Sequence, residues 1–182
     1  AESTSTLILD TRSAASFTVG FVPNSINIGI KGDFAPWVGA LIGDVKQEIL
    51  LVTDSGMEEE VITRLSRVGF DHVVGYLEGG FEAWKTSGKE IDQVTRITPD
   101  TFAEQFELNK SLVIDVRKEG EYAAEHVSES YSKPLAYINE WTKDINPNEH
   151  FFLHCQGGYR SMIAASILQA RGYRNFSEVD GG

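Results

Sequence analysis

The sequence contains one cysteine in 182 residues, and this scarcity excludes several kinds of protein. A single cysteine cannot form an internal disulfide, and no CxxC motif is present. The four histidines are scattered along the chain rather than paired at metal-ligand spacing, so we expect no metal site and no cofactor. Because a free thiol is most easily maintained in a reducing compartment, the composition favours a cytoplasmic protein.

Positive charge and long apolar runs are also scarce. The chain has 16 lysines and arginines against 27 acidic residues, and its net charge of −11 argues against nucleic acid or an anionic membrane as a partner. No apolar run is long enough to span a bilayer, and no signal-peptide pattern opens the chain. The remaining composition, 41% hydrophobic and 24% charged, is ordinary for a soluble globular protein.

The chain contains an internal repeat. A short apolar strand that ends in Asp-x-Arg occurs at 7–12 and again at 112–117, and the segments that follow keep step in both copies. Each copy also leads its last strand into Gly-Gly, at 79–80 and 181–182. This period exceeds the roughly 20–50 residues of solenoid repeats, so it indicates a duplicated domain. The polar stretch 87–93 marks the boundary, which predicts domains at 1–93 and 94–182.

Short apolar strands alternate with helical stretches within each copy. This alternation is typical of an α/β domain, so we predict two domains, each with a mostly parallel sheet flanked by helices. Ligands of such sheets bind outside the carboxyl ends of the strands. The cysteine, Cys155, falls at such a place, directly after an apolar strand at 151–153.

The loop that contains Cys155 has the composition of a reactive-thiol site. Gly157 and Gly158 allow a tight turn before a long helix, and the N–H groups of such a loop and helix start attract an anion. Arg160 adds a positive charge, and Ser161 is expected to cap the helix or to hydrogen-bond the thiolate. The alternative is an inert, buried cysteine that acts as a small apolar residue.

The same loop resembles the active-site loop of the rhodanese-type sulfurtransferases. The matching residues are Cys155, Gln156, Gly157, Gly158, Tyr159, Arg160 and Ser161. Cysteine phosphatases of related fold place five residues between their cysteine and arginine, whereas four lie between Cys155 and Arg160. The shorter ring suits a single sulfur atom better than a phosphate. The resemblance therefore implies a persulfide on Cys155, with residues Gln156 to Ser161 binding the substrate.

The resemblance extends over almost the whole chain. Both Asp-x-Arg pairs and the stretch 76–84 look like rhodanese landmarks, which implies two tandem rhodanese-like domains. Asp115 and Arg117 are expected to support the site as a structural ion pair rather than to take part in the chemistry. His154 is expected to face away from the sulfur of Cys155, because neighbours along a strand point to opposite faces.

The first copy lacks the reactive residues. Thr53 stands where the second copy has Cys155, and Glu58 stands where it has Arg160. Carboxylates at a helix start suit the helix dipole but repel an anionic donor, so the first domain is predicted to be inactive and to shape one wall of the cleft. The first copy also lacks a lead-in segment before its Asp-x-Arg strand, and the second lacks a final helix. We therefore expect domain 1–93 to be truncated at its N-terminus and domain 94–182 at its C-terminus.

These features together predict a sulfurtransferase. It would move sulfane sulfur from thiosulfate or a small-molecule persulfide to a thiol or cyanide through a Cys155 persulfide, and its partners would be that donor and a thiol acceptor. The single positive charge of the loop favours a weakly charged donor, such as a glutathione-like persulfide. Three alternatives stay open. The first is the sulfur-handling or regulatory part of a persulfide-oxidising fusion enzyme, whose N-terminal domain, of metallo-β-lactamase fold, would be missing here. The second is a cysteine phosphatase or arsenate reductase. The third is a non-catalytic interaction module.

Overall fold

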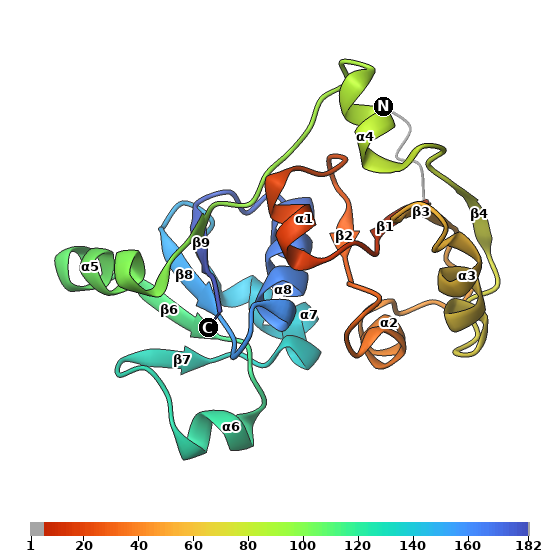
Figure 1. Ribbon diagram of the computed structural model, residues 1–182. Coiled ribbons are helices and arrows are strands. Elements are labelled where there is room, and N and C mark those ends of the chain that lie inside the picture. The colour runs from red at the N-terminus through yellow and green to blue at the C-terminus, as the bar shows by residue number, and fades with distance from the viewer. Residues whose placement is uncertain (1–5, 182) are drawn as a thin grey trace. The chain divides into compact units, whose positions relative to one another are not determined.

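The computed structural model describes residues 6–181, so the ends at which the two domains are predicted to be truncated, Ala1 and Gly182, lie outside this range. Contacts divide the chain into two compact units, with the boundary between Gln93 and Val94. Each unit has its own sheet, and every strand pair in the two sheets is parallel (Figure 1). The predicted α/β fold class, with two parallel sheets and flanking helices, is confirmed.

The first unit contains a four-stranded sheet in the order β2-β1-β3-β4. Its strands are β1 (Leu7–Asp10), β2 (Ile26–Asn27), β3 (Ile49–Val52) and β4 (Val73–Tyr76). Its helices are α1 (Ala14–Val19), α2 (Phe34–Leu41), α3 (Glu58–Ser66) and α4 (Gly80–Thr86). The central strands β1 and β3 are short and largely apolar, as expected for strands covered on both faces.

The second unit contains a five-stranded sheet in the order β5-β9-β8-β6-β7. Its strands are β5 (Arg96–Ile97), β6 (Leu112–Asp115), β7 (Ser130–Ser132), β8 (Phe151–His154) and β9 (Phe176–Val179). Its helices are α5 (Pro99–Asn109), α6 (Glu119–Ala124), η1 (Leu135–Tyr137), α7 (Ile138–Trp141), η2 (Thr142–Asp144) and α8 (Tyr159–Ala170).

Strand order and register relate the two units residue by residue. The order β2-β1-β3-β4 repeats as β7-β6-β8-β9, and the second unit adds β5 beside β9. Asp10 pairs with Val52 in the first sheet, as Asp115 pairs with His154 in the second. The next residue along the chain is Thr53 in the first unit and Cys155 in the second, so the two occupy equivalent positions.

The two Asp-x-Arg sequences form the same turn. The Arg12 guanidinium donates hydrogen bonds to both carboxylate oxygens of Asp10 and to the carbonyl oxygen of Gly20. In the second unit, Arg117 bonds Asp115 in the same way and donates to the carbonyl oxygen of Glu125. Each arginine thus ties the end of a central strand to the end of the helix that follows it, which is a structural role.

Helix α8 fixes the carboxyl end of β8 in place. Nine consecutive residues, from Ser161 to Gln169, are buried, and the helix packs on β8, β9 and η1. A helix that is buried on all sides is held rigidly by its surroundings. Gly172 follows it with a φ of +91°, which is the left-handed conformation that ends a helix and that glycine adopts without strain. The loop between β8 and α8 is therefore anchored at both ends.

Candidate active site

Cys155 lies where β8 ends, and its side chain is almost completely buried, with 3% of the residue exposed. Its sulfur lies 3.3 Å from the hydroxyl oxygen of Ser161, the third residue of α8. Helix α8 begins at Tyr159 rather than at Ser161, with Gly158 at its N-cap. Of the two roles expected for Ser161, the structure therefore shows the contact with the sulfur and not the helix cap.

Gly158 makes room for an arginine directly beneath the loop. Its φ is +76°, and a Cβ atom placed on it would lie 2.7 Å from Nη2 of Arg96. The Arg96 guanidinium is only 14% exposed and forms ion pairs of 2.6 Å with Glu178 and 3.0 Å with Asp180. No other residue type at position 158 would allow both this backbone conformation and this close approach without strain. Gly157, in contrast, has no left-handed conformation.

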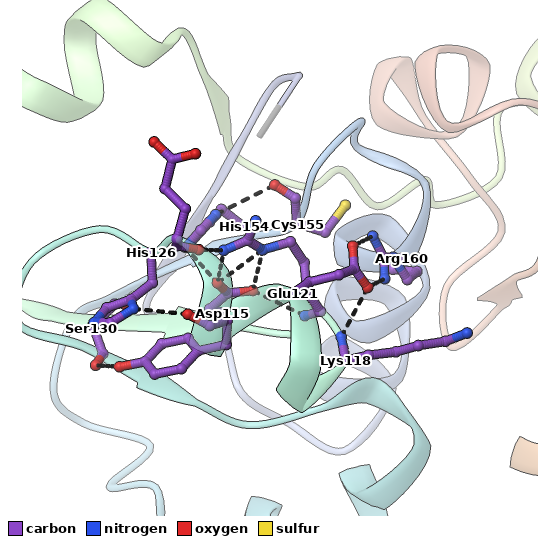
Figure 2. Close-up of polar contacts among 11 residues, drawn as sticks. Asp115, Lys118, Glu121, His126, Ser130, His154, Cys155 and Arg160 are labelled. Atoms are coloured by element: carbon purple, nitrogen blue, oxygen red, sulfur yellow. Dashed lines mark hydrogen bonds and ion pairs between the residues drawn. The ribbon is translucent and has the colours of Figure 1, made fainter.

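Arg160, the cation expected to serve the thiolate, is paired with a carboxylate. Its guanidinium donates two hydrogen bonds, of 2.6 and 2.8 Å, to Glu121 of α6 (Figure 2). The backbone N–H of Lys118 donates a third bond to the same carboxylate. These contacts, with the Arg160 bonds first, lower the pKa of Glu121 from its ordinary 4.5 to about 2. Arg160 also interacts electrostatically with Cys155, so one guanidinium is shared between the sulfur and Glu121.

His154 does not contact the sulfur through its ring nitrogens. Its Nδ1 lies 3.3 Å from the backbone carbonyl oxygen of Cys155, and its Nε2 lies 3.8 Å from the carboxylate of Asp115 (Figure 2). Burial lowers the pKa of His154, so the ring is neutral near pH 7. His154 nevertheless contributes to the lining of the cavity beside the sulfur.

A cavity of about 360 Å³ opens beside Cys155. Its lining combines charged, polar and apolar residues from the carboxyl ends of β6 and β8 and from the segment after α6: Arg117, Glu125, His126, Val127, His154, Cys155 and Gln156. Among these residues Arg117 is neutralised by Asp115, and Glu125 adds a negative charge. A cavity of this size accepts a small molecule, but its walls offer little free positive charge.

The first unit retains the framework of this site without its chemistry. Thr53 is buried at the end of β3 and lines a cavity of about 390 Å³ together with Asp54 and Arg12. Glu58, Glu59 and Glu60 occupy the first turn of α3. Arg12 is neutralised by Asp10, so Asp54 and Glu82 leave the lining of this cavity net negative.

The structure adds three residues that sequence reasoning did not connect with Cys155. Glu121 pairs with Arg160 from 39 residues away, and Arg96 pairs with Glu178 from 82 residues away. One signal was available in the sequence. Glu178 is a charged residue within the short, otherwise uncharged strand 176–179, and a carboxylate in such a strand needs a partner when it is buried.

The α/β domain occurs twice along the chain. Its second copy presents a buried thiol in a tight loop before a helix. The chain belongs to the rhodanese-like domain family, which matches residues 1–87 and 98–182. Both units are therefore rhodanese-like domains, as the sequence resemblance implied. Family membership alone does not make each copy catalytic.

Individual relatives are distant. The chain is 23% identical over 123 residues to the putative sulfur carrier protein YrkF of Bacillus subtilis, covering 67% of this chain and 59% of that protein. It is 26% identical over 106 residues to a tRNA uridine(34) hydroxylase of Chlamydia felis, covering 52% of this chain and 33% of that protein. A solved thiosulfate sulfurtransferase from Pseudomonas aeruginosa aligns with 97% of this chain and 38% of its own at 17% identity and a TM-score of 0.42. The chain thus spans less than two thirds of each of these proteins.

Two further findings concern residues 6–181. No helix in this range is long and apolar enough to cross a membrane. No group of three or more histidine, cysteine, aspartate or glutamate side chains in the same range is arranged to hold a metal ion.

Proposed function

We propose that this protein is a sulfurtransferase that carries sulfane sulfur on Cys155. The observation that supports the proposal is the position of this thiol, buried at the carboxyl end of β8, beside a cavity and in the loop before α8. In the first step, the sulfur of Cys155 attacks the outer sulfur of a donor, and the donor's sulfur–sulfur bond breaks. In the second step, an acceptor thiolate or cyanide attacks the outer sulfur of the persulfide and releases Cys155.

The charges around the cavity favour a donor that carries little charge. Arg160 and Arg117 are both paired with carboxylates, and Glu125 lies in the cavity wall. A doubly charged donor such as thiosulfate would meet compensated cations, whereas a small organic persulfide would meet a cavity of suitable size. We therefore propose a persulfide of a small thiol as the better donor and a small or protein thiol as the acceptor, in a reducing cytoplasm.

The first unit acts as a non-catalytic domain in this proposal. Its equivalent of Cys155 is Thr53, whose hydroxyl cannot store a sulfur atom, and the acidic start of α3 would disfavour an anionic donor. The loop of the second unit is also one residue shorter than the phosphatase loop, which supports sulfur transfer over dephosphorylation.

Mass spectrometry of the intact protein tests the proposal. After incubation with glutathione persulfide or thiosulfate, we expect one added sulfur atom on the peptide that contains Cys155, and its loss on addition of a thiol. Faster loading from the persulfide of an uncharged small thiol, such as 2-mercaptoethanol, than from thiosulfate would support the preference for a weakly charged donor. Hydrolysis of a phosphate ester without any sulfur loading would instead identify a phosphatase.

A further inference from the structure

A chain of hydrogen bonds leads from the active-site sulfur to a buried carboxylate. The Cys155 sulfur contacts the Ser161 hydroxyl at 3.3 Å, and that hydroxyl donates a short bond of 2.5 Å to Oε1 of Glu178. Ser161 and Glu178 are both 0% exposed. The chain ends on the carboxylate, to which the Arg96 guanidinium donates two hydrogen bonds.

The direction of the protons along this chain follows from valence. A serine hydroxyl has one proton, and Ser161 gives it to the ionised carboxylate of Glu178. Towards Cys155, Ser161 can therefore only accept, so the thiol S–H donates to the serine oxygen. This is the orientation in which the serine oxygen can take the thiol proton while it passes its own proton to Glu178.

We propose that the Ser161 hydroxyl relays the proton of Cys155 to Glu178 during sulfur loading, and that Arg96 is a positioning residue for this carboxylate. As the sulfur attacks the donor, the S–H bond breaks and its proton moves to Ser161 Oγ. The original Ser161 proton moves to Glu178 Oε1, and the electron pair of the donor's sulfur–sulfur bond leaves with the departing group. When an acceptor thiolate removes the outer sulfur, Cys155 regains its electron pair, and the two protons return along the same path.

The surroundings of Glu178 suit a group that gains and loses a proton. Burial raises the pKa of Glu178 above its ordinary value, although the bonds from Arg96 and Ser161 act in the opposite direction. The charged groups that face Glu178 are Arg96 of β5 and Asp180, which follows β9 and shares the same guanidinium. The ion pair with Arg96 stabilises the ionised carboxylate, whereas the low exposure of the site favours its neutral form.

Within the described residues, the contacts that link Cys155 to Ser161, Glu178 and Arg96 have no counterpart in the first unit. The register places Tyr76 of β4 opposite Leu51, as Glu178 of β9 lies opposite Leu153, and Tyr76 is 51% exposed. Among residues 6–93, no strand beside β4 corresponds to β5, which supplies Arg96. The carboxylate and the arginine that binds it therefore occur together with the thiol.

The inference rests on the proposed function, but it can be tested without any sulfur donor. The rate at which iodoacetamide alkylates Cys155 in the intact chain is measured from pH 5.5 to pH 9 in steps of about 0.5 pH units. If Glu178 acts only through its charge, Glu178→Gln removes a nearby negative charge and alkylation becomes faster. If Glu178 receives the proton, an amide cannot replace it, and we expect alkylation near pH 6 to be at least about tenfold slower, with a steeper dependence on pH.

Ser161→Ala provides the second arm, because it breaks the relay but leaves the Arg96–Glu178 ion pair intact if Glu178→Gln fails to fold. We expect the same loss as in Glu178→Gln, and no further loss in the double variant, since both changes interrupt one path. Glu104→Gln, an exposed carboxylate on α5, is the matched control and should behave like the wild type.

The relay is overturned if either Glu178→Gln or Ser161→Ala is alkylated as fast as the wild type. It is also overturned if the double variant loses the product of the two single fold-changes in alkylation rate. Sulfur loading is then measured separately on the wild type. If alkylation slows in the variants as expected but the wild type takes up no sulfur from any donor, the proposed function is refuted and the relay stands. If the wild type takes up sulfur but alkylation is unchanged in the variants, the relay is refuted and the proposed function stands.

Discussion

The pairing of Arg160 with Glu121 makes a quantitative prediction about donor charge. Glu121→Gln keeps the size of the side chain but removes the carboxylate that binds the guanidinium through two hydrogen bonds. Arg160 would then offer its full charge to a donor at the mouth of the loop. The change is therefore expected to favour anionic donors over neutral ones.

The exposure of the Arg160–Glu121 ion pair sets the size of the expected effect on donor binding. The side chains of Arg160 and Glu121 are 18% and 31% exposed, so the site lies between bulk water and the protein interior. Two unit charges 4 Å apart interact by about 1 kcal/mol in water and about 4 kcal/mol at an effective dielectric constant near 20. An interaction energy near the lower of these limits, about 1–1.4 kcal/mol, corresponds to a fivefold to tenfold change in the affinity for an anionic donor. We therefore expect KM for thiosulfate to fall by about five- to tenfold, with a smaller change for a singly charged persulfide.

Steady-state kinetics with both donors at low and high salt measure this effect. Salt near 1 M shortens the screening length to about 3 Å and should remove most of the gain. Glu119→Gln, on the same helix and exposed, is the control. An unchanged or higher KM for thiosulfate in Glu121→Gln would show that Glu121 orients Arg160 rather than neutralising it, and the charge argument would be wrong.

Four further predictions follow from the site. Cys155→Ser should abolish sulfur loading while the thermal unfolding curve stays close to that of the wild type, because the serine hydroxyl cannot hold a transferable sulfur. Arg160→Lys should raise KM for anionic donors despite the retained charge, because a lysine cannot make the paired bonds of a guanidinium; steady-state kinetics decide this. The stability that Glu121 adds should be present above pH 4.5 and lost as pH falls towards about 2, since its folded-state pKa is lowered; urea unfolding of wild type and Glu121→Gln should differ by about 1 kcal/mol or less at pH 7 and converge in acid, because the pair is partly exposed. In a Cys155→Ser background, Thr53→Cys should acquire no persulfide by mass spectrometry, whereas adding Glu58→Arg should recover part of the loading.

The features that could be predicted from the sequence are those that depend on local pattern. The Asp-x-Arg strands, the apolar strand before Cys155 and the glycine-containing loop each lie within a few residues, so their spacing carries the information. The start of α5 is also marked locally, because the Thr98 side chain accepts a hydrogen bond from the N–H of Thr101 and a proline follows it at the first helical position. The equivalence of Thr53 and Cys155 also followed from the repeat and agrees with the strand register.

The electrostatics of the site could not be predicted in this way. Sequence reasoning treated Arg160 as an available cation, but its charge depends on Glu121, which the fold brings to it from another helix. The same holds for Arg96, whose role is set by a β5–β9 pairing between residues 82 positions apart. Glutamates and arginines are common on protein surfaces, so nothing in the local sequence marks the few that become buried partners.

The two copies show why an active site is more than its loop. The framework of strands, Asp-x-Arg turn and cavity is present in both units, so under the proposed function it cannot be what makes only the second domain reactive. The differences lie in the thiol, in the cation shared with Glu121, and in the buried Ser161–Glu178–Arg96 set beneath the loop. Because Arg96 approaches Gly158 so closely, that set also fixes the loop that carries the thiol. Transplanting Cys155 and Arg160 alone into the first unit should therefore restore less reactivity than transplanting them with the carboxylate and arginine beneath.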